Sequence, residues 1–489
     1  MKREVYEYAL RLGAEAYQLH QSHLTFARGF KDSFDYKKAI EHYEAAIKHN
    51  PNVPEAWAQL ADCWMNVDQF DNAQACYKQA LRLNPTLIGA MLGYADTMSY
   101  NERPQDALKV LERARALIKP GTQEAKLYPI ARGNACFIAG DLKGAERAFR
   151  DTIAQDPAFG AGYGSLANVL NEQGRHEEAW ACYVKAYQLV PEPRYGMNIA
   201  LHGLLTGRYE EGWKHWECRL ESLHRDDYAR FKGKPRWDGE APGALYVWTE
   251  QGLGDLIQFS RYLPLLKARG NRVILEVYPN FMSYALTLPG VDEVVPRTPD
   301  LRVLHKYDHQ QPLMSLPLTL KLWSPEQSPG YGVAEKQLTE ARSVALSWYG
   351  NPDHENDRNR SMKLKELAGL VRQFPGIHWF TVLPEPRAAE DIAKLGLPIE
   401  QRKGTIVEAE GWLRDADLLI TVDTSHAHLA GKAGTPTWLL LPFNPDWRWG
   451  VTGERTAWYP SLRILRQTKR GRWTTVVDEV SKRLEAAKA

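Results

Sequence analysis

Asp423, Thr424 and Ser425 form a polar turn between an apolar run, residues 418–422, and a segment of small residues. The run predicts a buried strand, and the three side chains are favoured at the start of a helix. Amides at a helix N-terminus suit phosphate, and ligands of parallel sheets lie beyond the carboxyl ends of the strands. The turn is therefore a candidate nucleotide site. The same side chains could serve only as helix caps, and the turn alone does not separate the two interpretations.

A glycine turn, Gly252-Leu-Gly254-Asp255, follows a predicted strand, residues 244–248, and precedes a predicted helix, residues 256–269. The glycines would let a ligand approach the backbone, and Asp255 could act as a general base. The third glycine of a dinucleotide fingerprint is missing, so the signal for NAD is weak. From this turn alone, a role for Asp255 in favouring the helix dipole is the preferred interpretation.

A polar loop that begins at Asn351 follows another predicted strand, residues 343–349. Its Arg358, Arg360 and Ser361 could bind a pyrophosphate, because guanidinium groups match phosphate oxygens. The alternative is a solvated loop whose charges pair with one another.

Two further groups of residues lie near the Asp423 turn. His426 and His428 are two positions apart, so on a helix they do not face one another, and no metal is expected. His428 fits a buried, hydrogen-bonded imidazole and is kept as a candidate contact to the donor. Trp447 and Arg448, after the predicted strand 438–441, could stack on a base or sugar. Packing between two lobes is the preferred alternative for this pair.

The first half of the chain is repetitive. Pro51 and Pro85, like Pro157 and Pro191, stand 34 residues apart, and Pro51, Pro85 and Pro191 each follow a matching set of alanine and tyrosine positions. This period, with small residues where two helices would cross, predicts a tetratricopeptide α-solenoid over residues 1–224. Such an array binds protein or peptide, and its aromatic residues are predicted to be core.

The second half alternates strand-like and helix-like segments, which predicts parallel α/β sheets. We expect two Rossmann-like lobes, residues 243–330 and 331–472, with a linker at 225–242 and a closing helix at 473–489. The fold class is therefore α + α/β. Two facing lobes would place the turn at Gly252 and Gly254 and the turn at Gly350 across one cleft from the Asp423 turn.

Composition excludes several classes of partner. Lys and Arg number 62 against 60 Asp and Glu, and this balance gives no reason to expect nucleic acid or anionic membrane. The sequence shows no signal peptide and no apolar run long enough to span a bilayer. The five cysteines lack metal-type spacing, so a reducing, cytoplasmic location is expected.

Residues 423–436, Asp-Thr-Ser-His-Ala-His-Leu-Ala-Gly-Lys-Ala-Gly-Thr-Pro, resemble the signature of the family 9 (heptosyltransferase-like) glycosyltransferases. The turn at 252–255 resembles the Leu-Gly-Asp turn of the same enzymes. Nearly the whole chain is similar to bacterial proteins that join tetratricopeptide repeats to such a glycosyltransferase, for example flagellin glycosyltransferases of the FlmG type. The layout is also similar to protein O-GlcNAc transferases. Two positions depart from the family: Ser425 replaces the usual Gly, and Lys432 interrupts the small-residue helix.

The resemblance implies a GT-B fold with the nucleotide mainly on the second lobe. It implies that Asp255 is the base and that Asp423, Thr424 and Ser425 contact the donor sugar and phosphates. The expected activity is metal-independent and cofactor-free transfer of a sugar from a nucleotide-sugar to a protein acceptor held by the repeats, with flagellin Ser/Thr as one candidate. The alternatives are a non-catalytic repeat scaffold with a degenerate GT-B half, and a transferase acting on a lipid-linked or small-molecule sugar.

Overall fold

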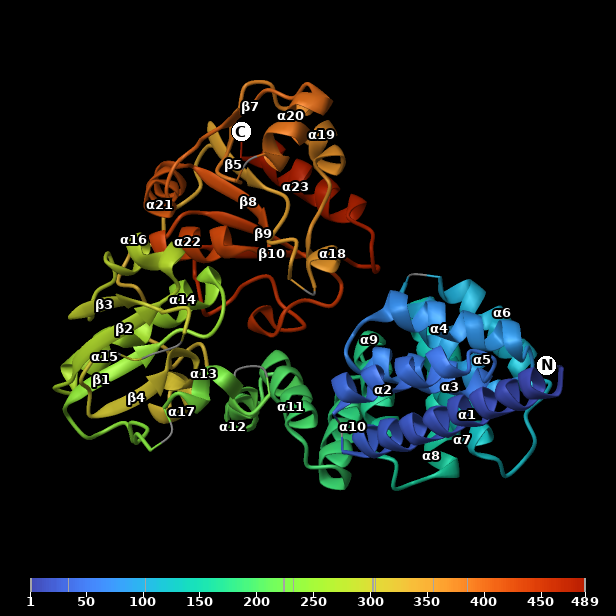
Figure 1. Ribbon diagram of the computed structural model, residues 1–489. Coiled ribbons are helices and arrows are strands. Elements are labelled where there is room, and N and C mark those ends of the chain that lie inside the picture. The colour runs from blue at the N-terminus through green and yellow to red at the C-terminus, as the bar shows by residue number, and fades with distance from the viewer. Residues whose placement is uncertain are drawn as a thin grey trace. The chain divides into compact units, whose positions relative to one another are not determined.

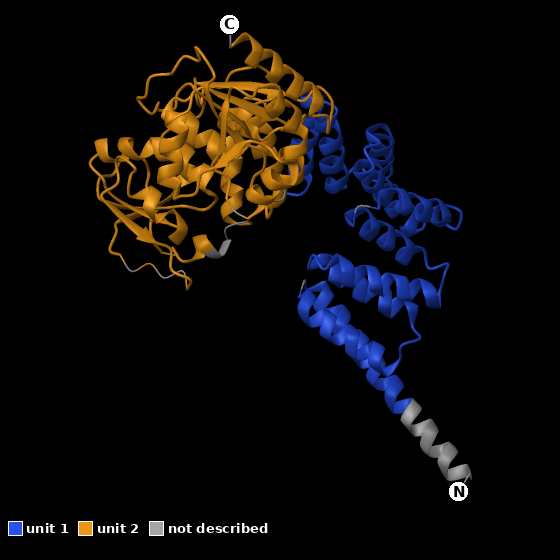
Figure 2. Ribbon diagram, turned by 90° about the horizontal axis from the view of Figure 1, so that it is seen from above, with its two compact units in different colours: residues 1–191 blue, residues 192–489 orange. Residues whose placement is uncertain are grey.

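The computed structural model describes residues 2–33, 35–101, 103–222, 225–231, 233–300, 303, 305–354, 356–384 and 386–487, with the backbone only for 2–13 and 225–226. The chain divides into two compact units, Met1–Pro191 and Glu192–Ala489 (Figure 2). The predicted boundary at residue 224 and residues 488–489 of the predicted closing helix lie outside the described residues.

Unit 1 is a series of antiparallel helix pairs, as the repeat period predicts. The alanines and tyrosines of the repeat are buried where the paired helices cross. Tyr77 donates a hydrogen bond to Asp62 Oδ1 at 2.6 Å, and Tyr183 donates to Asn168 Oδ1 at 2.7 Å, so in these two repeats the tyrosine bonds to the residue fifteen positions earlier. The helices are α1 (Lys2–Asp32), α2 (Tyr36–His49), α3 (Pro54–Asn66), α4 (Phe70–Leu83), α5 (Ile88–Tyr100), α6 (Pro104–Arg115), α7 (Gln123–Ile138), α8 (Leu142–Gln155), α9 (Gly160–Glu172) and α10 (His176–Leu189).

Two more helices, α11 (Pro193–Leu205) and α12 (Tyr209–Trp216), continue the helical pattern but belong to unit 2. Trp213 and Trp216 on α12 are buried in the same core cluster as the strands of unit 2. The indole of Trp213 donates to the Trp323 carbonyl at 2.7 Å. The helix pair is therefore part of the α/β core.

Unit 2 contains two parallel sheets with helices on their faces (Figure 1). The first has the strand order β3-β2-β1-β4, and the second has the order β10-β9-β8-β5-β6-β7. The strands are β1 (Ala244–Trp248), β2 (Arg272–Val277), β3 (Glu293–Pro296), β4 (His309–Pro312), β5 (Ser343–Ser347), β6 (His378–Thr381), β7 (Ile399–Gln401), β8 (Leu418–Val422), β9 (Thr437–Leu441) and β10 (Leu462–Arg466). Every pairing between these strands is parallel, which confirms the predicted α/β class.

The helix after the glycine turn differs from the single helix predicted over 256–269. It begins earlier, as α14 (Leu253–Phe259), becomes a 3₁₀ turn at Ser260–Tyr262, and resumes as α15 (Leu263–Ala268). Pro264 stands in the first turn of α15, where its missing N–H ends the preceding helix and starts a new one.

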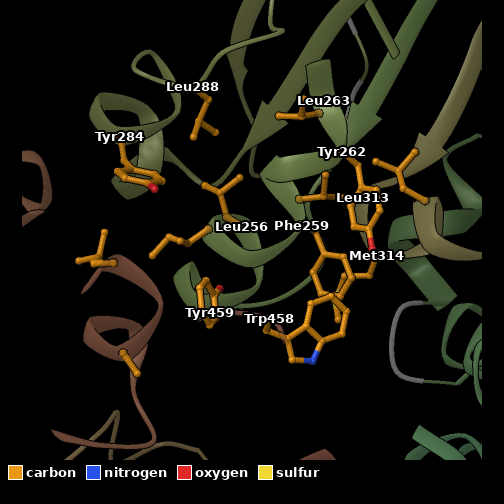
Figure 3. Close-up of a cluster of buried hydrophobic side chains, with 14 of the residues drawn as sticks. Leu256, Phe259, Tyr262, Leu263, Tyr284, Leu288, Leu313, Met314, Trp458 and Tyr459 are labelled. Carbon is orange, nitrogen blue, oxygen red and sulfur yellow. The ribbon is translucent and has the colours of Figure 1, made fainter. Parts of the chain in front are cut away.

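One apolar core joins the two sheets. It contains Leu245 and Val247 of β1 together with Leu419 of β8 and Leu439 of β9. Figure 3 shows the side chains of Leu256 and Phe259 on α14 lying beside Tyr459 and Trp458, which come from the second sheet's side of the unit. Within the described residues, no helix is long and apolar enough to cross a membrane.

The remaining helices of unit 2 cover the sheets. They are α13 (Arg225–Ala229), α16 (Met282–Ala285), α17 (Leu316–Thr319), α18 (Asp357–Arg360), α19 (Leu364–Gln373), α20 (Arg387–Leu395), α21 (Ile406–Asp415), α22 (Ser425–Ala433) and α23 (Thr474–Ala486). Of these, α22 packs against α14, so a helix of the second sheet contacts the helix that follows β1.

Candidate functional site

The candidate turns follow the strands from which the chain builds each sheet outward, first to one side and then to the other. In the second sheet the chain starts at the central strand β5, runs outward to β7, and returns to β8 on the other side of β5. Asn351 follows β5 and Asp423 follows β8, and these strands pair through Ser347 and Thr421. In the first sheet the glycine turn follows β1, which lies between β2 and β4. Such switch points are where open α/β sheets bind ligands.

Asp255 both caps its helix and forms an ion pair. Its Oδ2 accepts a hydrogen bond from the Gly252 N–H at 3.1 Å, which is the capping role expected from the sequence. Its Oδ1 pairs with the guanidinium of Arg448, on the loop after β9. Burial and the nearby carboxylate of Asp446 raise the pKa of Asp255, whereas Arg448 opposes the shift. A carboxylate with a raised pKa is suited to accept a proton near neutral pH.

The two glycines of the turn have different surroundings. A Cβ on Gly254 would lie 3.0 Å from Cδ2 of His428, so this glycine allows α14 to approach α22. Gly252 is exposed, and a Cβ there would meet only the Asp255 carboxylate, at 3.7 Å. Of the two glycines, Gly252 is the one with open space beside its backbone.

Thr424, rather than Asp423, caps α22. Its Oγ1 accepts a hydrogen bond from the His426 N–H at 3.2 Å. Asp423, the residue before this cap, is buried at 8% exposure. Burial and the charge of Asp446 raise the pKa of Asp423 to about 6, although Arg360, Arg448 and the Trp449 indole favour its charged form. Ser425 is partly exposed at the first position of the helix.

The loop after β5 places its candidates in different surroundings. Ser361 holds the loop closed, because its Oγ accepts from the Gly350 N–H at 2.9 Å and donates to Asp357 at 2.6 Å. The Arg360 guanidinium lies over Gly350, where a Cβ would be 2.7 Å from Nη2. Asn351 and Arg358 are exposed. Arg360 is therefore the loop candidate that joins the charges around Asp423.

Arg448 connects the two sheets. Besides Asp255, it binds Asp446 Oδ1 at 2.8 Å and donates from Nε to Gln258 Oε1 on α14 at 2.7 Å. Trp447 is buried, with its ring 5.4 Å from that of Trp213 in an edge-to-face contact. Trp447 therefore packs in the core, in agreement with the packing interpretation that was preferred from the sequence. Arg448 makes the polar contacts.

His428 is a buried imidazole whose Nδ1 lies 2.8 Å from the Tyr459 hydroxyl. Burial, together with Arg448, Arg261 and Arg360, holds the pKa of His428 well below its usual range, so the ring is neutral at pH 7. His426 bonds instead to Ser347 at 3.0 Å, and burial lowers its pKa to about 4.

A buried ion pair fixes the base of the glycine turn. Arg219, in the 3₁₀ turn Glu217–Leu220 after α12, donates from Nε to Glu250 Oε2 at 2.6 Å, and both side chains are 0% exposed. Arg219 also donates to Ser315 Oγ at 2.8 Å. Glu250 precedes Gly252 by two residues, so this pair holds the segment that leads into the turn.

The site thus gathers three carboxylates, those of Asp255, Asp423 and Asp446, with the guanidinium groups of Arg360 and Arg448. Sequence reasoning did not single out Asp446, Gln258, Glu250 or Arg219. Among the described residues, no three His, Cys, Asp or Glu side chains are grouped so that they could hold a metal ion. The arrangement offers cations for an anionic ligand beside Asp255 and Asp423, whose pKa values are raised.

Comparison with known proteins identifies the repeats. Residues 31–86 and 130–192 match models of the tetratricopeptide repeat. Unit 1 is therefore a tetratricopeptide repeat array.

Over its length the chain is similar to Protein FlbA of Caulobacter vibrioides, with 25% identity across 91% of this chain and 81% of that protein. It is also 25% identical to the human protein O-mannosyl-transferase TMTC3, across 33% of this chain and 19% of that protein. Among solved structures, the tetratricopeptide protein TTC0263 of Thermus thermophilus matches with 23% identity and a TM-score of 0.34, over 37% of this chain and all of that one.

Proposed function

We propose that the chain is a glycosyltransferase of GT-B type, which moves a sugar from a nucleotide-sugar to a protein recruited by the repeats. The observation that carries the proposal is the ion pair of Asp255 with Arg448, because it joins the turn after β1 to the loop after β9 beside Asp423. Residues far apart in the chain thereby form one polar site at two switch points, where α/β proteins bind ligands. Two similarities support the proposal. One is that to FlbA, which spans most of both chains, and the other is that to a protein named as an O-mannosyl-transferase.

In the proposed reaction Asp255 takes the proton of an acceptor hydroxyl. The acceptor oxygen bonds to the anomeric carbon of the donor sugar, the bond from that carbon to the phosphate oxygen breaks, and a nucleotide leaves. Arg360, Arg448 and the positive N-terminal end of the α22 dipole stabilise the negative charge that develops on the phosphate. Arg448 would have to exchange part of its contact with Asp255 for the phosphate, which frees the carboxylate to act as a base.

Nucleotide binding is the first test. UDP, GDP, CMP and ADP are titrated separately against the full chain while its thermal unfolding is followed. A nucleotide at 100 times its dissociation constant should stabilise unit 2 by about 2.7 kcal/mol. If none of the four shifts the transition, the proposal fails and the chain is better explained as a repeat scaffold.

The role of Asp255 is tested by the variant Asp255→Asn. The amide keeps the size of the side chain but cannot accept the proton, so we expect transfer to be lost while nucleotide binding remains. Transfer is measured as a mass increase of candidate acceptor proteins, flagellin included, co-expressed with the chain. Full transfer by Asp255→Asn would remove this residue from the mechanism, and sugar found only on lipid or small-molecule acceptors would replace the protein acceptor in the proposal.

A further inference from the structure

A pocket in unit 1 lies between three consecutive helices. It has a volume of about 250 Å³ and is lined by Lys78, Leu81 and Arg82 of α4, Pro85 of the connection that follows, Met91 and Tyr94 of α5, and Val110 and Arg113 of α6. Leu81 and Arg82 stand three and four positions after Lys78, and the pairs on α5 and α6 are each three positions apart, so the lining residues of each helix share one face. The volume matches one or two amino-acid side chains rather than a drug-sized ligand.

The charged residues around this pocket are all cations. Three of the eight lining residues are Lys or Arg, and none is acidic. Lys78, Arg82 and Arg113 are exposed, and none of them pairs with a carboxylate in the described part of the chain. Arg82 has one long contact, 3.4 Å, to the Gln79 side chain. The pocket therefore presents three cationic groups that an anionic ligand could bind.

The positions of these cations lower the stability of the repeat. Lys78 and Arg82 are like charges at i,i+4 on one helix, which destabilises a helix. Arg82 and Arg113 each lie in the last turn of a helix, where a cation favours the helix dipole. That effect does not account for Lys78, which lies one turn earlier, nor for three cations meeting at one apolar pocket.

We propose that this pocket binds an acidic peptide segment that inserts one aliphatic or aromatic side chain. The apolar side chain would enter between Leu81, Met91 and Val110, and flanking carboxylates would bind the three cations. Met91 is buried in the core shared by α5 and α6, so the floor of the pocket is rigid. A nucleic acid fits less well, because three cations around one small pocket do not form a track for a phosphate backbone.

The proposal concerns unit 1 and does not depend on the proposed transferase. Its test uses the full chain and fluorescence anisotropy with a labelled nine-residue peptide, Gly-Asp-Glu-Asp-Leu-Glu-Asp-Glu-Gly. Two control peptides replace every acid by its amide, or the leucine by serine. A labelled strand of ten thymidine nucleotides is titrated in parallel.

Two double variants carry the same change of charge. Lys78→Glu with Arg113→Glu reverses two cations of the pocket on different helices. Lys48→Glu with Arg115→Glu reverses two exposed cations of the same unit that do not line it. All four positions are exposed, and thermal unfolding followed by circular dichroism checks that both variants fold.

We expect the acidic leucine peptide to bind with a dissociation constant below about 1 mM, and to bind more tightly than either control peptide. The pocket variant should weaken binding by at least about tenfold and the matched variant by less than about twofold. Raising NaCl should also weaken binding. The proposal is overturned if the peptide does not bind, if both double variants weaken it equally, or if the thymidine strand binds more tightly than the peptide.

Discussion

Replacing Arg219 by methionine should destabilise unit 2 more than any exposed charge change. The substitution keeps a long side chain but removes the guanidinium that binds Glu250. The Glu250 carboxylate would then be left fully buried, with the Met314 N–H at 3.3 Å as its remaining hydrogen bond among the residues that the structure describes. A carboxylate without its counter-ion in such a site is strongly disfavoured.

The magnitude follows from the burial of the pair. Removing one partner of a buried ion pair costs about 3–5 kcal/mol, because the other charge stays in the interior. For a unit as large as residues 192–489, about 2 °C of Tm is lost per kcal/mol. Arg219→Met should therefore lower the Tm of unit 2 by about 6–10 °C.

The chain offers a matched control in the same unit. Arg272 and Glu293 form an ion pair of the same length, 2.6 Å, but their side chains are 57% and 32% exposed. Because an exposed pair contributes at most about 1 kcal/mol, Arg272→Met should lower the Tm by no more than about 2 °C. Differential scanning calorimetry of the full chain measures both variants.

A double variant separates loss of packing from the uncompensated charge. In Arg219→Met with Glu250→Gln, no unpaired carboxylate is left at position 250, so at least about half of the lost stability should return. The reasoning would be refuted if Arg219→Met cost no more than Arg272→Met. It would also be refuted if the double variant were less stable than Arg219→Met.

Three further changes test the site and the core. Gly350→Ala should cost little stability but push the flexible end of Arg360 away, weakening nucleotide binding by about 1.5–3 kcal/mol in a thermal-shift titration. A raised pKa of about 6 means that folded Asp423 binds its proton more tightly than the unfolded chain does, so stability falls as pH rises from about 4 to 6. Asp423→Asn should remove that fall and add up to about 3 kcal/mol at pH 7 in urea unfolding, and an unchanged pH profile would contradict the assignment. Burial raises the pKa of Cys63 and Cys76 to about 11 each, so both thiols should react with a disulfide reagent at pH 8 only after unfolding in urea.

The fold was predictable where local pattern and burial agree. Strands 244–248 and 418–422 are found at their predicted bounds, because each is a short apolar run between turn residues. Strand β4 was not foreseen, since its sequence is His-Gln-Gln-Pro. Gln310 and Gln311 are buried there because their side chains bond to Trp248 at 2.9 Å and to Thr319 at 2.8 Å. A strand whose buried residues are polar gives no hydrophobic signal.

The site was only partly predictable for a related reason. The turns after β1, β5 and β8 were identified because polar residues follow apolar strands there. The partner of Asp255 comes from a position 193 residues later, and no local pattern encodes such a contact. Arg219 was not singled out from the sequence, because its partner Glu250 lies 31 residues away in the chain.

The tryptophans of α12 determine where the protein can be divided. Trp213 and Trp216 contact Trp447 at ring distances of 5.4 and 5.9 Å, so a fragment that starts at residue 243 would lose one wall of its own interior. Cutting before Glu192 instead keeps that wall. Recombination that exchanges repeat arrays between genes would therefore keep the core of unit 2 intact only if the crossover lies upstream of α11 and α12.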